Sequence, residues 1–460
     1  MSLPAPDRGV LGHPRGLAVL AATEGWIGFS FYGTQSLLVL FMTARLLQPG
    51  HAERVLGLPA LRAALGHPAP AALAAAIMGL YGALAYATPI LGGLAADRLL
   101  GRTRAVALGA VLMTAGHLLM AFEPCFLVAL CCLVCGMGLA GTLKAQVGAL
   151  YARDDPRRAA AFQLYSIAIG IAVILAPLAC GTLGEAVDWR WGFLAAGTGM
   201  LLGLATYAAG RRLLPPEPPR RPLGTRAPRL APADRRAMAA LAALLPVLAV
   251  ASVGNMEIFN AYLVWGRDSY ALTFAGHAMP VSWLLSLDAL VGVGALAGSL
   301  AFWRWWARRR RMPHELTRMA AGAAIAAAAP LVLAAASHHV AGGGRVGLGW
   351  GLAFHVVNDV GFANLYPVGM ALYSRAAPPA LGATVVNAYA LHLFLSNLLV
   401  GWLAGLLGTM PAERFWLLHA ALVGAAALVL LLCAPLFRPI LDAQAAAAGP
   451  APGPAPLPAR

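Results

Sequence analysis

The chain has few charged residues and only one lysine. Asp, Glu, Lys and Arg make up 11% of its 460 residues, against roughly 25% in soluble domains. Lys144 is the only lysine, and Arg supplies the other 32 of the 33 basic residues. A soluble protein of this length needs far more polar surface, so the composition excludes an ordinary soluble domain.

Several signatures of enzyme and metal sites are also missing. No G-x-x-x-x-G-K-[ST] loop occurs, which argues against an ATP-driven pump. No H-E-x-x-H, G-x-S-x-G or paired intramembrane Asp motif supports an enzyme embedded in a membrane. Cys132 and Cys135 have C-x-x-C spacing, but no His or carboxylate lies beside them, which favours helix packing. We therefore expect no enzyme, no metal site and no bound cofactor.

Long apolar runs dominate what is present. AVILMFWYC residues reach 60% of the chain, and the mean hydropathy is +0.73. The runs recur from end to end, and each has the ~18 residues that a transmembrane helix needs. The pattern predicts an all-α polytopic membrane protein with twelve spans, at about 16–47, 71–97, 104–123, 125–151, 159–184, 191–210, 236–265, 279–306, 315–337, 346–376, 380–408 and 413–440.

The net charge of +15 is concentrated in alternate loops between these runs. The loops after spans 2, 4, 6 and 8 are rich in Arg, and the intervening loops carry few basic residues. By the positive-inside rule, the Arg-rich loops and both termini lie in the cytoplasm. Orientation signals explain the charge better than nucleic-acid binding does, so the expected partner is a lipid bilayer. The Ala- and Arg-rich composition is typical of a GC-rich bacterium, which predicts the bacterial inner membrane.

The predicted organisation is two halves of six helices. Residues 211–235 are rich in Pro and Arg and lack helical periodicity, so they read as an irregular cytoplasmic linker. This layout is common among transporters with a site between two related bundles. The predicted units are an N-terminal tail (1–15), a six-helix bundle (16–210), the linker (211–235), a second six-helix bundle (236–440) and a low-complexity, disordered tail (441–460).

Five short segments carry a resemblance to a known family. GGLAADRLLGR (92–102) resembles the signature of the major facilitator superfamily in the loop between helices 2 and 3. EGWIGFSFYG (24–33), VGALYARDDPRRAAAF (147–162), PVSWLLSLDAL (280–290) and NLYPVGMALYSRAAPP (364–379) resemble segments of the proton-dependent oligopeptide transporter family. The similarity runs in order through both halves, from about residue 16 to residue 440.

The resemblance implies a proton-coupled symporter of di- and tripeptides that works by alternating access. It also implies a monomer driven by the proton gradient, without a bound cofactor. The chain differs from the family's ExxER motif at two positions, where Ile27 and Gly28 replace the second Glu and the Arg. These differences leave two other functions open. The chain could carry a different small solute, such as an amino-acid derivative or a drug-like molecule. It could also be a sensor or scaffold that has lost transport.

Lys144 and four acids lie well inside predicted spans, and His355 and His392 are span histidines that could relay protons. A charge at the centre of a bilayer costs at least ~2.5–3.5 kcal/mol on insertion scales, and such residues usually face a cavity or a partner. One polar cavity between the two halves would explain all five together. These candidates for proton coupling are Glu24, Lys144, Glu257, Asp288 and Asp359.

The resemblance assigns further roles residue by residue. Glu24 matches the first Glu of ExxER, and Lys144 lies about one helical turn, ~6 Å, nearer the cytoplasm than the family's lysine. Lys144 either replaces that lysine or snorkels to the headgroups. Asp288 stands where the family has Asn, and Glu257 has no certain equivalent. The candidate substrate contacts are Tyr32, Tyr81, Lys144, Asp288, Asn358, Asp359 and Tyr389, and the candidates for conformational gating are Asp97, Arg98 and Arg102.

Overall fold

The computed structural model describes residues 9, 12–152, 155, 157–217, 230–378 and 381–447. Within these residues the chain is almost entirely helical. The strands there are β1 (Thr273–Phe274) and β2 (His277–Ala278), which form a short antiparallel hairpin. The predicted all-α class is therefore confirmed.

The first half of the chain forms helices that match six of the predicted spans. A short helix, α2, and several 3-10 and π-helical turns lie between or at the ends of the long ones. The α-helices are α1 (Arg15–Phe41), α2 (Leu58–Ala64), α3 (Pro70–Ala95), α4 (Arg102–Leu119), α5 (Phe126–Ala140), α6 (Leu143–Ala149), α7 (Arg157–Ala186) and α8 (Trp189–Ala209).

The second half forms the helices of the other six spans. Three of these spans are single long helices and the rest are broken or extended. The helices are α9 (Pro232–Ala251), α10 (Val253–Glu257), α11 (Ala261–Ser269), α12 (Trp283–Ala307), α13 (Glu315–Val340), α14 (Leu348–Arg375), α15 (Gly382–Tyr389), α16 (Leu391–Leu403) and α17 (Ala412–Ala447).

Nine helical segments of the described chain are long and apolar enough to cross a membrane. The remaining three predicted spans correspond to α4, to the broken run α9–α11 and to α14. Each has a reason to be less apolar or interrupted. Arg102 and Arg104 lie in the first turn of α4, and His355, Asn358 and Asp359 lie within α14.

Three predicted spans are interrupted in the structure. The span predicted at 236–265 is three helices that together run from residue 232 to residue 269. The side chain of Glu257 explains part of this break, because its Oε1 accepts the backbone N–H of Ala261 at 3.1 Å. The spans predicted at 125–151 and 380–408 break between α5 and α6 and between α15 and α16.

The predicted boundary of the C-terminal tail at residue 441 is wrong. Helix α17 continues to Ala447, so 441–447 are helical. Leu441 is fully buried, and the Asp442 carboxylate accepts from Arg375 Nη1 at 2.9 Å, so packing and an ion pair extend the helix. The linker is also shorter than predicted, because α9 begins at Pro232. The predicted tail 448–460, the N-terminal 1–8 and the linker 218–229 lie outside the described residues.

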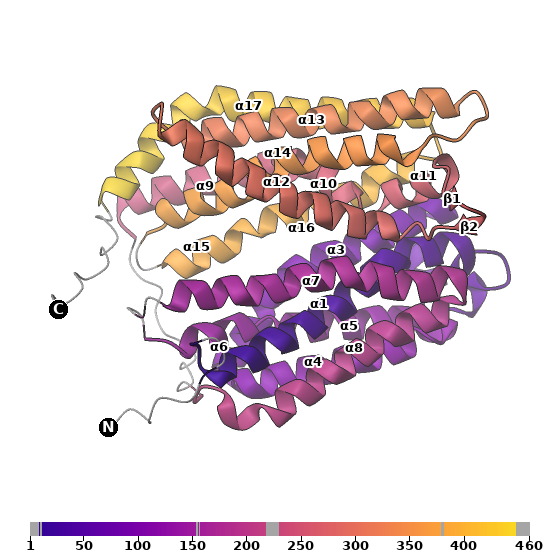
Figure 1. Ribbon diagram of the computed structural model, residues 1–460, viewed down its shortest axis with the longest axis horizontal. Helices are drawn as coiled ribbons and strands as arrows, with labels where there is room; N and C mark the ends of the chain where they lie inside the picture. The colour runs from indigo at the N-terminus through magenta and orange to yellow at the C-terminus, as the bar shows by residue number, and fades with distance from the viewer. Residues whose placement is uncertain are drawn as a thin grey trace.

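The helices are grouped in two bundles (Figure 1). In the first, α1 packs against α7 and α8, and α4 packs against α5 and α8. In the second, α13 packs against α14 and α17, and α12 packs against α14. The start of α1 and the end of α17 lie at one end of the molecule, here called the termini end. The β1–β2 hairpin lies at the opposite end, here called the hairpin end.

The two most extensive contacts between the bundles are those of α3 with α16 and of α7 with α12. The first pair approaches closely because both helices carry glycine at the contact. A Cβ atom on Gly79 would lie 2.4 Å from the Cα of Gly401, and a Cβ on Gly401 would lie 3.0 Å from the Cα of Gly79. Only glycine permits this approach of two backbones.

The second pair is held together by hydrogen bonds near the hairpin end. The carboxylate of Glu185, at the end of α7, accepts the backbone N–H groups of Val281 at 2.8 Å and Ser282 at 2.9 Å. Trp283 Nε1 donates to Thr182 Oγ1 at 3.0 Å. Because Val281 and Ser282 immediately precede α12, Glu185 holds the start of one bundle's helix against the other bundle.

At the termini end, Glu217 connects the start of the linker to α4. Its carboxylate accepts the backbone N–H groups of Arg102 at 2.9 Å and Thr103 at 2.6 Å, which are free donors in the first turn of a helix. Partial burial raises the pKa of Glu217, but the hydrogen bonds from Thr103 and Arg102 outweigh burial and hold the pKa below its ordinary value. The contact is therefore made by the ionised carboxylate.

Replacing Glu217 with Ala removes both acceptors. We expect amide hydrogen exchange at Arg102 and Thr103 to become at least about tenfold faster at neutral pH, the effect of losing about one hydrogen bond. Because the folded-state pKa is lowered, the contact is present at neutral pH and is lost as the pH falls below the carboxyl's ordinary pKa. Wild type should lose protection in that acidic range, after correction for intrinsic exchange. The control is Asp234→Ala, which removes the acceptor of the backbone N–H of Ala231, just before α9. It should leave exchange at Arg102 and Thr103 unchanged. Equal exchange at these two amides in Glu217→Ala and wild type would contradict the contact.

Candidate functional site

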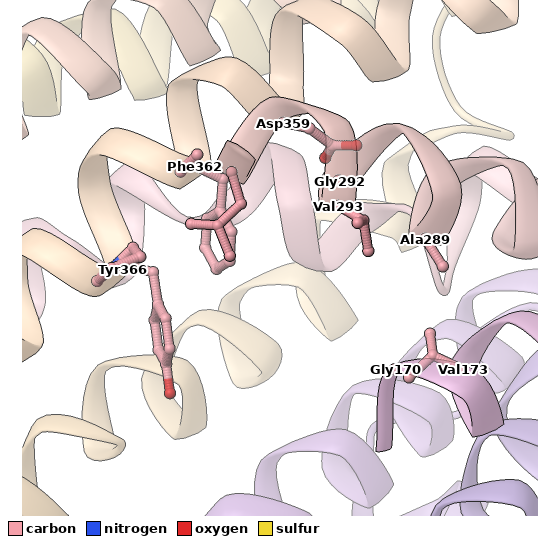
Figure 2. A pocket seen from close by; sticks show the side chains of 11 residues that line it. Gly170, Val173, Ala289, Gly292, Val293, Asp359, Phe362 and Tyr366 are labelled. Atoms are coloured by element: carbon pink, nitrogen blue, oxygen red, sulfur yellow. The ribbon is translucent and has the colours of Figure 1, made fainter. Parts of the chain in front are cut away.

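A cavity of about 310 Å³ lies between the two bundles. Helix α7 of the first bundle forms one wall, and α12 and α14 of the second bundle form the others. Figure 2 shows Gly170 and Val173 facing Ala289 and Val293 across this space, with Asp359, Phe362 and Tyr366 on α14. The lining residues are Gly170, Val173, Ala289, Gly292, Val293, Leu296, Asp359, Phe362, Ala363, Tyr366 and Pro367.

Two glycines leave room in the cavity. A Cβ on Gly170 would meet no atom within 4 Å, so the missing side chain is open space. A Cβ on Gly292 would lie 3.6 Å from Asp359 Oδ2. A larger residue at position 292 would therefore cover the carboxylate. The cavity is thus an apolar space with one acid, Asp359, in its lining.

Among the described residues that line this cavity, Asp359 is the only charged one. Its Oδ1 accepts from Asn358 Nδ2 at 3.2 Å, and its Oδ2 has no hydrogen-bond partner among the described residues. The residue is 6% exposed. A buried acceptor without a partner costs about 1–3 kcal/mol, more if it is charged. The arrangement therefore suits a ligand that brings a cationic donor, such as an amino group.

A second acid and a histidine lie beside Asp359. Asp288 Oδ1, on α12, is 2.8 Å from Nδ1 of His355, which lies one turn before Asp359 on α14. Asp288 is also within electrostatic range of Asp359. Asp288, His355 and Asp359 are called the acid–histidine cluster below. The structure thus brings together the two acids predicted on spans 8 and 10.

In the first bundle, Glu24 on α1 lies within electrostatic range of Lys144 on α6 and beside the hydroxyl of Tyr165 on α7. Glu24 is half-buried, whereas Lys144 is exposed. The pairing of Glu24 with Lys144 stays a prediction, supported by this electrostatic proximity. Gly28 stands at the position of the Arg in the ExxER motif, and Ala172 fills the space beside it. A Cβ on Gly28 would lie 3.2 Å from the Cβ of Ala172.

Three tyrosines connect the two groups of charges. Tyr32, on α1, lies within electrostatic range of Glu24 and of Tyr366, which lines the cavity. Tyr86, on α3, lies within the same range of Tyr32 and Tyr366. Since α1 and α3 belong to the first bundle and α14 to the second, these side chains lie within electrostatic range of one another across the interface.

Other predicted site residues lie in helix packing. Tyr81 is buried and its ring stacks on Phe31 at 6.1 Å. Tyr389 is 1% exposed, and its hydroxyl donates to the carbonyl of Tyr366 at 3.1 Å. The hydroxyl proton of Tyr389 is thus engaged inside the second bundle, and Tyr389 is not among the residues that line the cavity.

Glu257 and Asn358 are buried as well. Glu257 Oε2 lies 3.4 Å from His419 Nε2 on α17, inside the second bundle, and the cavity lining does not include it. Asn358 donates to Asp359 and so positions that carboxylate rather than lining the cavity. Among the predicted gating residues, Arg102 Nε lies 3.4 Å from Asp97 Oδ1, while Arg98 is exposed. The observed pair is therefore Asp97 with Arg102.

The sequence predicts His355 only as a possible proton relay, alongside His392, and Tyr262 is not among the predicted site residues. Tyr262, on α11, has its hydroxyl 2.9 Å from His355 Nε2. Both residues lie in spans that contain several tyrosines and histidines, and the sequence gives no reason to select one of them as a site residue over the others. Only the rotation of each helix about its axis selects the one that faces Asp288, and one sequence does not determine that rotation.

Comparisons with known sequences agree with this architecture. The pattern of the Major Facilitator Superfamily matches residues 26–400. A di-/tripeptide transporter of Lactococcus lactis subsp. cremoris is 36% identical over 260 residues, which are 55% of this chain and 48% of that protein. The chain thus spans about half the length of the curated relatives that it matches.

Solved structures show the same fold. The crystal structure of a peptide transporter POT in complex with sulfate has a TM-score of 0.82 and 24% identity, over 95% of this chain and 97% of that chain. A POT family transporter in complex with 5-aminolevulinic acid has a TM-score of 0.80 and 20% identity, over 94% of this chain and 98% of that chain. The matched family and these proteins are transporters rather than enzymes.

The attraction between Glu24 and Lys144 is testable by a double-mutant cycle. Glu24→Gln and Lys144→Gln each remove one charge, and the double variant removes both. We expect the two effects on thermal unfolding in detergent to be non-additive by about 0.5–1 kcal/mol, because Lys144 is exposed and solvent screens part of the attraction. The control cycle pairs Lys144→Gln with Glu53→Gln, an exposed acid that accepts from Gly50 N–H, and should be additive. Additivity in both cycles would rule out the pairing.

Proposed function

The chain belongs to the major facilitator superfamily, and we propose that it is a proton-coupled transporter of di- and tripeptides that works by alternating access. Within the superfamily we assign it to the proton-dependent oligopeptide transporters. The proposal rests on Asp359, which lines the cavity between the two bundles and has one carboxylate oxygen without a hydrogen-bond partner among the described residues. The di-/tripeptide transporters among its relatives support the choice of substrate.

A peptide is a zwitterion, and the site offers one charge for each of its ends. The amino group binds Asp359 in the apolar cavity, and Phe362 and Tyr366 contact an apolar side chain. The carboxylate is attracted to Lys144, the basic residue near Glu24 on the opposite bundle. A bound peptide then bridges the two bundles, so its binding is coupled to their relative position.

Alternating access follows from where the bundles are joined. Glu185 and Thr182 hold α7 against the start of α12 at the hairpin end, so this conformation is closed there. Transport requires these bonds to break while the termini end closes, as the bundles rock about the central site. Three N–H donors would then need water, which is available outside the membrane core.

We place the termini end in the cytoplasm of a bacterial inner membrane. The Arg-rich loop after span 2, with Arg98, Arg102 and Arg104, and the Arg-rich loop after span 8 lie at that end by topology. The proton gradient supplies the free energy, without a bound cofactor, and the working unit is a monomer within the lipid bilayer.

A smaller solute is the second candidate. Gly28 stands where the family has the Arg that meets a peptide carboxylate, and Ala172 packs against it. One similar structure holds 5-aminolevulinic acid, which carries an amino group and a carboxylate in one short chain. This observation favours an amino-acid derivative as the alternative substrate.

Uptake of labelled dialanine into proteoliposomes tests the proposal. With an inwardly directed proton gradient, we expect accumulation several-fold above the equilibrium level, and a protonophore should abolish it. Competition by other dipeptides and by 5-aminolevulinic acid distinguishes the two substrate classes. If dialanine neither enters nor is displaced while 5-aminolevulinic acid accumulates, the peptide assignment is wrong.

Two variants separate a transporter from a transport-inactive sensor or scaffold. Asp359→Asn removes the charge that receives the amino group, and Lys144→Gln removes the one that attracts the carboxylate. Each should lower dialanine uptake at least about tenfold, since a charged hydrogen bond contributes about 1.5–3 kcal/mol. Glu53→Gln, at an exposed acid outside the site, should keep wild-type uptake. Full uptake in all three variants would contradict the assigned site.

A further inference from the structure

We propose that His355 and Asp288 form a proton-carrying site of the transport cycle, with Tyr262 and Tyr270 completing its hydrogen-bond chain. The inference rests on the proposed function and goes beyond it by assigning one proton to a pair of residues on helices α14 and α12. The resemblance to the peptide transporter family gave His355 no role. The assignment comes from the contacts of this chain.

The four side chains form a continuous hydrogen-bonded chain. His355 Nδ1 lies 2.8 Å from Asp288 Oδ1, and His355 Nε2 lies 2.9 Å from the hydroxyl of Tyr262. The Tyr270 hydroxyl is 3.5 Å from that of Tyr262. His355 is 0% exposed, whereas the side chain of Asp288 is 18% exposed. The buried histidine therefore connects to accessible space through Asp288.

Both protonation states of His355 keep their hydrogen bonds in this chain. When the ring is neutral, Nδ1–H donates to Asp288 and Nε2 accepts from the Tyr262 hydroxyl. When the ring is protonated, both N–H groups donate, and rotation of the Tyr262 O–H lets it donate to Tyr270 instead. When His355 gains or loses a proton, rotation of the Tyr262 hydroxyl keeps both ring nitrogens hydrogen-bonded.

The added proton also has a counter-charge. A protonated ring beside the Asp288 carboxylate forms an ion pair, which a buried cation needs. Protonation of His355 makes the charge of the acid–histidine cluster one unit more positive. Asp359, one helical turn away, feels this change directly. Protonation is thereby linked to the residue that faces the cavity.

The other buried histidines within the described spans lack this arrangement. His117 lies between the hydroxyls of Ser30 and Thr34, with no acid in contact. His392 Nδ1 contacts the carbonyl of Tyr389, and its Nε2 has no partner among the described residues. His419 Nδ1 lies 2.8 Å from the carbonyl of Phe415, and its Nε2 lies 3.4 Å from Glu257. His355 alone among them has a short contact to an acid and a hydroxyl chain.

The charges around the pair come from several helices. Helix α12 contributes Asp288, and α14 contributes Asp359. Helix α11 and the residue after it contribute two neutral tyrosines. On α10, Glu257 is engaged with His419, and on α13, His339 packs 5.5 Å from the Trp350 ring. The groups facing the pair are therefore Asp359, Tyr262 and Tyr270, with Glu257 and His339 on the neighbouring helices.

The first experiment counts protons on the purified protein. Acid–base titration of detergent-solubilised wild type between pH 8 and pH 5 is compared with His355→Gln and with the control His117→Gln, which changes a histidine that is equally buried but has no acid partner. We expect His355→Gln to bind one proton fewer than wild type and His117→Gln to bind the same number. An unchanged count in His355→Gln overturns the proposal, whatever transport shows.

The second experiment separates proton coupling from substrate binding. In proteoliposomes, dialanine counterflow requires no proton gradient, whereas accumulation does. We expect His355→Gln to lose at least about tenfold in gradient-driven accumulation and to keep counterflow within about threefold of wild type. Asp288→Asn, which keeps the shape of the side chain, should behave alike and covers the case in which His355→Gln does not fold. Equal loss of counterflow and accumulation in Asp288→Asn would show a merely structural pair and overturn the proposal.

The two experiments also distinguish this inference from the proposed function. If the proton count falls in His355→Gln but wild type accumulates no dialanine, the peptide assignment fails and the proton site stands. If wild type accumulates dialanine and His355→Gln accumulates it equally, the transport assignment stands and the proton site is wrong.

Discussion

A charged side chain inside a membrane needs a partner or water, and this constraint organises the interior of the protein. Asp288 contacts His355, Glu257 contacts His419, and Glu24 lies within electrostatic range of Lys144. Asp359 differs, because it lines a cavity and one of its carboxylate oxygens has no hydrogen-bond partner among the described residues. The acid whose pairing is incomplete is thus the one that lies at the interface of the bundles.

The same interface is built for close contact at some points and for space at others. Gly79 and Gly401 let the backbones of α3 and α16 touch. Gly170 and Gly292 have no side chain, so they leave space in the walls of the cavity. Glu185 adds a polar connection at the hairpin end, on backbone groups that precede α12. Close packing, an open site and a breakable polar contact are the parts that alternating access requires.

Much of the fold was predictable, because apolar length and loop charge are local properties of the sequence. All twelve predicted spans have helical counterparts, and the five ionisable residues were found by their position within apolar runs. The breaks within span 7 were not predictable. The hydrogen bond from the Ala261 backbone N–H to the Glu257 side chain forms only where the helix is already interrupted, so the sequence pattern does not reveal it. The extension of α17 past residue 440 depends on Arg375, more than sixty residues away, and so left no local signal. The pairing of Asp288 with His355 depends on the rotation of two helices, and the burial of Tyr389 on a carbonyl of its neighbour.

Cysteine labelling at position 170 tests whether the cavity beside Asp359 is reached by water from between the bundles. Gly170→Cys, made after the six native cysteines are replaced, places a thiol where a Cβ meets no atom within 4 Å. We expect this thiol to react with a charged, membrane-impermeant maleimide from the termini side and to be protected by dialanine. Reaction only with a maleimide that dissolves in lipid, unaffected by dialanine, would show instead that the position faces the bilayer and that no substrate site lies there.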